Sequence, residues 1–277
     1  MKKLVALSLG LCLSAGSFIV AFAQESSEQV MQPPNVFVIQ REFVKPGRSG
    51  STHEKSESAF VQAMTAAKWS THYFAADSLS GPTRSLFFIG YDSFAAWEKD
   101  NQATAANATL SAAVDKAALA DGDLLTEYDT GVFIYREDLS LHAPVNIARM
   151  RYFEISRFVV RPGHGEEWET LVHEYAEAFG KAVPDAHFAM FESVYGAENG
   201  GVFLAITPMK SLAQTDRSFA DSKKMAAGLG ESGMKKIEDL EASCVESVQT
   251  NLFIFNPKMS YPADSWIKAD PDFWSPK

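Results

Sequence analysis

The sequence predicts an α+β protein built from two copies of one β-α-β-β-α-β unit, packed sheet to sheet. Residues 24–138 and residues 149–256 agree in three respects and in the same order: identical residues, the spacing of apolar residues, and the residues of the turns. Agreement of all three kinds indicates an internal duplication. One such sheet carries helices on one face only, so we expect the second copy to cover the other face.

The first match is a strand and its turn. Residues 39–47 (IQREFVKPG) and 155–163 (ISRFVVRPG) each indicate a strand that stops at a basic-Pro-Gly turn, because proline cannot continue a ladder and glycine allows the tight bend. A helix follows in both copies. In the second copy its apolar residues recur at helical spacing: Trp168, Leu171, Val172, Tyr175 and Phe179.

The next match is a hairpin, formed by residues 72–78 and 86–89 in the first copy and by 187–193 and 202–205 in the second. A glycine-containing turn separates the strands of each pair, as in β-hairpins. Helical stretches are expected around 94–100 and 110–119, and again around 211–221 and 225–240. Each copy then closes with a strand, at 130–135 and at 250–255.

Two segments lie outside the copies. Residues 139–148 form the expected linker, and residues 257–277 form an irregular tail that could wrap over one copy. The tail has four prolines and two tryptophans, Trp266 and Trp274.

Residues 1–23 predict a cleaved export signal. Lys2 and Lys3 precede an uncharged, largely apolar run that ends in Ala21-Phe-Ala23, so we expect cleavage after Ala23 and a periplasmic or secreted protein. No second long apolar run follows, so the mature chain is expected to be soluble and outside the membrane.

Charge and cysteine content narrow the possible partners. Loss of Lys2 and Lys3 takes the formal net charge from −10 to −12, which disfavours nucleic acids and anionic membranes as partners. Cys12 leaves with the signal, so Cys244 cannot form an intramolecular disulfide and is expected to be a small core residue.

With these elements in place, the chain resembles the dimeric α/β-barrel superfamily, which includes the antibiotic-biosynthesis-monooxygenase-like and NIPSNAP-like families. The resemblance rests on the strands that run into 44–47 (VKPG) and 160–163 (VRPG), on the helix after each, and on the order of the later elements. It implies a fused pair of ferredoxin-like units that form one pseudo-dimeric barrel around a cavity, so that the chain works as a monomer. Members include cofactor-free oxygenases, haem-degrading enzymes and isomerases, so the resemblance leaves the function and the cofactor unknown.

The candidate site residues are polar residues that occur in both copies. Arg41 and Arg157 lie in the first strands and could bind an anionic or carbonyl-containing ligand, together with Tyr73. His72 and His187 open the second strands and are the candidate catalytic bases. A structural role is the alternative for each: an arginine paired with a carboxylate, a histidine satisfied by the backbone, and a tyrosine in an aromatic core. Asp77 and Glu192 are a further acidic match.

No metal site is predicted. His173 and Glu177 are one helical turn apart but lack the second histidine of a His-Glu-x-x-His motif, so a surface pair is the better interpretation. His53 and Glu57 receive the same interpretation. Phosphate-binding, dinucleotide-binding and Gly-x-Ser-x-Gly motifs are absent from the sequence.

Three functions remain open. The first is a small-molecule-binding protein with a cavity between the repeats, and the second is a cofactor-free oxygenase or isomerase that uses His72 or His187 as a base. The third is a structural or interaction protein of the cell envelope, which would expose an apolar patch on the tail around Trp266 and Trp274.

Overall fold

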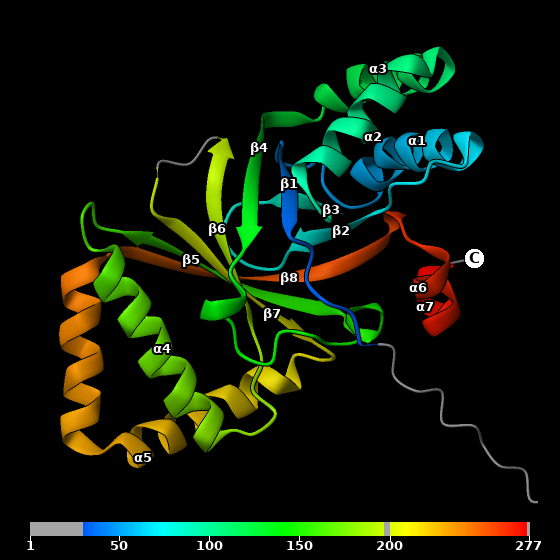
Figure 1. The fold of residues 1–277 in the computed structure, drawn as a ribbon. Coiled ribbons are helices and arrows are strands. Elements are labelled where there is room, and N and C mark those ends of the chain that lie inside the picture. The colour runs from blue at the N-terminus through cyan, green and yellow to red at the C-terminus, as the bar shows by residue number, and fades with distance from the viewer. Residues whose placement is uncertain (1–29, 197–199, 276–277) are drawn as a thin grey trace, which may run out of the picture.

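The computed structural model describes residues 30–196 and 200–275, which form a closed barrel of strands with helices on its outside (Figure 1). The expected export signal and its cleavage site lie outside the described residues. Within them, no helix is both long and apolar enough to cross a membrane.

The barrel contains eight antiparallel strands in the order β1-β3-β2-β8-β5-β7-β6-β4. Their bounds are β1 Val36–Val44, β2 Tyr73–Ser78, β3 Arg84–Tyr91, β4 Leu125–Tyr135, β5 Tyr152–Val160, β6 Ala189–Gly196, β7 Val202–Met209 and β8 Val245–Tyr261. The prediction of an α+β barrel is therefore confirmed. The two half-sheets do not simply face each other, because hydrogen bonds between β2 and β8 and between β4 and β6 join them. Closure gives every strand a neighbour on both sides, although β4 before Gly131 and β6 after Glu192 pair on one side only.

The helices lie in two groups on opposite sides of the barrel, one packed around α1 and the other formed by α4 and α5 (Figure 1). The first group is α1 Ser51–Ala67, α2 Phe94–Ala106 and α3 Ala108–Gly122; the second is α4 Gly165–Ala182 and α5 Ala213–Cys244. Helix α5 unites the two stretches expected at 211–221 and 225–240, with a break at Gly230, whose φ is 66°. Gly47 and Gly163 have φ values of 77° and 86°, as the basic-Pro-Gly turns require.

Apolar side chains from all eight strands line the barrel interior. A separate apolar core lies between the outer face of the second half-barrel and helices α4 and α5. Cys244 belongs to that core and is fully buried, as expected for a small core residue.

The linker and the tail are both packed against the barrel. Leu141 pairs with Phe188, and Val145 pairs with Met31, through isolated β-bridges. The tail, expected to be irregular, contains the end of β8 and two short helices, α6 Asp264–Ala269 and α7 Pro271–Trp274. Two short 3-10 helices, Glu137–Leu139 and Ile147–Arg149, flank the linker.

Candidate functional site

The barrel interior has three layers along its axis. On β1 the inward side chains are Phe37, Ile39 and Arg41 in succession, because alternate residues of a strand face the same side. The corresponding inward side chains are Phe153, Ile155 and Arg157 on β5, and Phe88, Leu86 and Arg84 on β3. Aromatic side chains thus line one end, arginines line the other, and a buried aliphatic layer separates the two ends.

The aromatic end holds a chamber of about 700 Å³. Its walls are mostly ring side chains in mutual contact; for example, the Phe74 ring stacks on Phe88 at 4.8 Å between centroids and on Trp266 at 5.2 Å. The aromatic lining residues are Phe37, Tyr73, Phe74, Phe88, Tyr135, Phe153, Phe191 and Trp266. Lysine and arginine are absent from the described residues that line it. Asp92 and Glu137 also line it, so the chamber disfavours an anion, and its rings suit a flat, largely apolar molecule.

Segments outside the eight-strand framework cover the chamber. These are residues 31–35 before β1, residues 143–147 of the linker and residues 262–266 of the tail. The tail is held in place by Trp274, which is 3% exposed and donates from Nε1 to the carbonyl oxygen of Ala148 at 2.7 Å. Trp266 packs against the apolar interior. The exposed apolar patch expected on the tail is therefore not present in the described residues, since both tryptophans are used internally.

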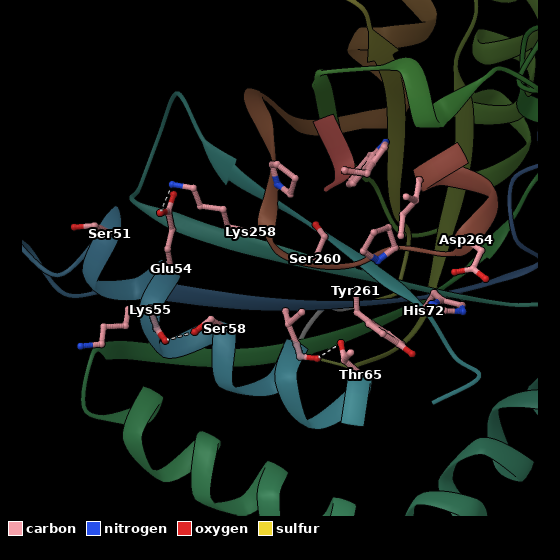
Figure 2. A pocket seen from close by; sticks show the side chains of 15 residues that line it. Ser51, Glu54, Lys55, Ser58, Thr65, His72, Lys258, Ser260, Tyr261 and Asp264 are labelled. Carbon is pink, nitrogen blue, oxygen red and sulfur yellow. Dashed lines mark hydrogen bonds and ion pairs between the residues drawn. The ribbon is translucent and has the colours of Figure 1, made fainter. Parts of the chain in front are cut away.

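His72 lies in the wall between this chamber and a groove on the surface. The groove runs between α1 and the end of β8, and Figure 2 shows His72 and Tyr261 near one end of it, with Ser51 and Lys258 near the other. The His72 ring stacks on Tyr261 at 4.7 Å between centroids. Its Nδ1 is buried and has no hydrogen-bond partner. His72 therefore offers an unused polar atom beside an apolar chamber.

Tyr73 lies at the edge of the chamber, but its ring packs on the outer face of the barrel, with Phe87 and Met259. Its hydroxyl is buried without a partner. Burial raises the pKa of Tyr73, and the nearby carboxyl of Glu57 raises it further. Its polar group therefore lies on the helix side of β2.

Arg41 and Arg157 share the cavity at the other end of the barrel, which has a volume of about 180 Å³. Arg41 is paired with Asp129 of the neighbouring strand through two hydrogen bonds, Nε to Oδ1 at 2.5 Å and Nη2 to Oδ2 at 2.9 Å. Arg84 also lines this cavity; burial lowers its pKa, and the charge of Arg41 lowers it further. Arg84 was not among the residues predicted from the sequence, although its place two residues before Leu86 in a predicted hairpin was a usable signal.

His187 does not share a cavity with His72 or with the arginines. Its Nδ1 lies 3.0 Å from the carbonyl oxygen of Asp185, and its Nε2 lies 2.9 Å from that of Pro208. Both ring nitrogens thus contact the backbone, which is the structural role that the sequence left open. The four polar candidates therefore do not form one site.

The matched acidic residues also have different surroundings. Asp77 accepts hydrogen bonds from Ser85 and Asn256. Glu192 accepts one from Arg136, at 2.8 Å. Neither lines the chamber.

The interpretation of His53 and Glu57 as a surface pair is wrong. His53 is 1% exposed and Glu57 is 3% exposed, and both lie in a buried polar cluster between α1, α3 and β1. His173 and Glu177, with the same spacing, are exposed on α4, as expected. Spacing alone could not separate the two pairs.

No protein-family model and no curated protein matches the chain. Among solved structures, the chain is similar to an anthrone oxidase-like protein at 12% identity, with a TM-score of 0.53, over 82% of this chain and 94% of that one. It is also similar to a candidate monooxygenase from Fusobacterium nucleatum at 10% identity, with a TM-score of 0.52, over 81% of this chain and 94% of that one. At these identities the likeness shows the fold alone, an α+β barrel with helices on its outside.

Proposed function

We propose that this chain is an exported small-molecule-binding protein that holds a flat, neutral, aromatic ligand in the chamber of its barrel. The observation that carries the proposal is the chamber itself: about 700 Å³, lined by aromatic rings and without cationic side chains among the described lining residues. A volume of this size is typical of sites for small organic molecules. Ring faces and edges favour other rings over flexible chains.

His72 is the candidate polar contact. Its ring lies beside the chamber, but Nδ1 has almost no accessible surface, so a ligand hydroxyl or carbonyl could satisfy Nδ1 only after the ring turns. The arginine end has no part in this site, because the aliphatic layer lies between the two cavities.

A second function, cofactor-free oxidation, is favoured by the same unpartnered nitrogen. His72 could accept a proton from an acidic C–H group of a bound ring ketone, and the resulting carbanion could react with dioxygen. Anthrone is a suitable probe because one protein with this fold is named for an anthrone oxidase. One anthrone and one dioxygen would give one anthraquinone and one water.

Two further parts of the proposal concern the chain as a whole. Export rests on the signal-like residues 1–23, and N-terminal sequencing of the mature protein from a bacterial host should begin at Gln24. The fusion of two ferredoxin-like repeats rests on the equivalent strand orders β4-β1-β3-β2 and β8-β5-β7-β6. Because the fused pair already closes the barrel, the chain is proposed to be a monomer.

Quenching of tryptophan fluorescence by anthrone tests the binding proposal, since Trp266 lines the chamber. We expect saturable quenching, and we expect Ala189→Phe, which fills the chamber, to weaken it about tenfold or more. Ala120→Phe makes the same change on the exposed face of α3 and should leave quenching unaltered. Equal quenching of the two variants would place the ligand elsewhere and would overturn the proposal.

Anthraquinone formation tests the second function in the same samples. Catalysis predicts a rate above the uncatalysed oxidation, which His72→Gln would remove while Ala120→Phe retains it. Binding with no rate above the uncatalysed one would leave the protein as a binding protein.

A further inference from the structure

A second candidate site lies outside the barrel, beneath α1 and α3. Four buried polar residues lie there. The exposed fraction is 6% for Glu42 of β1, 1% for His53 and 3% for Glu57 of α1, and 2% for Asp121 of α3. One ligand atom from each of these four residues lies within 4.8 Å of the others. Ionised carboxyl groups in such a place are costly unless a cation or protons balance them.

The hydrogen bonds around His53 orient it for a ligand. Ser85 donates its hydroxyl proton to Asp77 at 2.5 Å, so the Ser85 oxygen can only accept from Nδ1–H of His53, 3.3 Å away. When the ring is neutral, Nε2 then carries the lone pair; when the ring is protonated, Nε2–H donates to Glu42. That nitrogen points into the cluster, 3.0 Å from Oε2 of Glu42 and 3.6 Å from Oδ1 of Asp121. Metal-bound histidines are oriented in the same way by an outer hydrogen bond.

Two oxygens in the cluster lack any hydrogen-bond partner. They are Oε1 of Glu57 and Oδ1 of Asp121, and both are buried. A buried carboxyl oxygen without a partner is expensive, so these two adjacent acids need either a shared proton or a cation between them.

The equivalent position in the second half of the barrel, between β5 and α4, is filled by apolar residues, so the fold does not require polar residues there. Phe158 follows Arg157 and pairs with Phe203, as Glu42 follows Arg41 and pairs with Ser85. Trp168, near the start of α4, lies 5.0 Å from the Phe158 ring between centroids, within an apolar core. An apolar core thus serves beneath α4, whereas beneath α1 the chain buries a histidine and three acids. Stability alone does not explain that choice.

We propose that Glu42, His53, Glu57 and Asp121 bind one divalent ion of a first-row transition metal, such as Mn²⁺, Fe²⁺ or Zn²⁺. Three carboxylates and one imidazole suit these ions, and the imidazole favours them over Mg²⁺ and Ca²⁺. The ion would contact both unpartnered oxygens and connect α1 and α3 to β1. All four ligands come from the protein and are buried, so the ion has a structural role.

The metal content of the intact, purified protein tests this proposal. The protein is produced in medium that contains manganese, iron and zinc, desalted and measured by elemental mass spectrometry. We expect about one of these ions per chain. We also expect a melting temperature about 5 °C or more above that of protein refolded in EDTA. Refolding with Mg²⁺ or Ca²⁺ alone should not restore the higher melting temperature.

Glu57→Gln and His53→Gln each remove one ligand, and His173→Gln is the matched control on the exposed face of α4. We expect the two ligand variants to lose most of the metal and the control to retain it. If His53→Gln fails to fold, Glu57→Gln still decides, because glutamine copies the shape of the acid. Wild-type protein without metal after refolding with each transition metal, or Glu57→Gln with full metal content, would overturn the proposal.

Discussion

Replacing Glu57 by glutamine tests how far the buried acids limit the stability of the metal-free protein. Burial, with the charges of Glu42 and Asp121, raises the pKa of Glu57 from an ordinary value of 4.5 to about 10. The folded chain therefore keeps a proton that the unfolded chain releases above pH 4.5. Because the folded pKa is the higher one, stability is greatest below pH 4.5 and falls as the pH rises toward 10.

The size of the stability loss follows from the pH range between the unfolded and folded pKa values of Glu57. Each pH unit above 4.5 costs about 1.4 kcal/mol, so ionisation in the unfolded chain removes about 3 kcal/mol of stability by pH 7. Glutamine does not ionise, and its amide can donate toward Asp121 as the protonated acid would. We therefore expect Glu57→Gln to match the wild type near pH 4.5 and to exceed it by about 3 kcal/mol at pH 7.

Urea unfolding in EDTA, followed by tryptophan fluorescence at pH 5 and pH 7, measures the difference. Glu231→Gln, on the exposed face of α5, is the control and should show no gain that depends on pH. A Glu57→Gln gain of equal size at both pH values, or a loss at pH 7, would refute the reasoning. Without chelator the wild type is stabilised by the bound metal and Glu57→Gln is not. The variant should then be less stable than the wild type, whereas in EDTA it should be more stable.

Three further outcomes follow from single contacts. Arg41→Met leaves Asp129 unpaired and should lower the free energy of unfolding by about 1–3 kcal/mol, and addition of Asp129→Asn should recover part of that loss in urea unfolding. Trp274→Phe keeps a buried ring but removes the hydrogen bond to Ala148, so we expect a loss of about 1 kcal/mol, whereas Trp274→Ala should cost about 3–5 kcal/mol. His187→Gln should leave anthrone quenching unaltered, because His187 does not itself line the chamber; a weaker quench would contradict the placement of the site.

The order of elements could be predicted because apolar periodicity and turn chemistry are local properties of the chain. The basic-Pro-Gly turns and the strands before them lie where the pattern indicated. The exact ends of the strands were harder to predict. β8 extends to Tyr261 because its far end pairs with β2, a contact between distant segments that local patterns do not encode.

The site was harder to predict for the same physical reason. Both faces of β1 carry apolar residues, since one faces the barrel interior and the other faces helices, so alternation could not orient Arg41. His53 and Glu57 have the same spacing as an exposed pair on α4, and only the packing of α1 against α3 and the barrel buries them. His72 and His187 match in sequence, but their surroundings come from unlike segments, the tail for His72 and the end of β7 for His187.

The aliphatic layer across the middle of the barrel has a kinetic consequence. A molecule in the aromatic end cannot travel through to the arginine end, so it must enter and depart by the same route. That route passes the three covering segments, which come from the beginning, the middle and the end of the described chain. Residence time would therefore depend on the contacts that those segments make with a ligand at the mouth, and substitutions there could change the dissociation rate while the strands stay as they are.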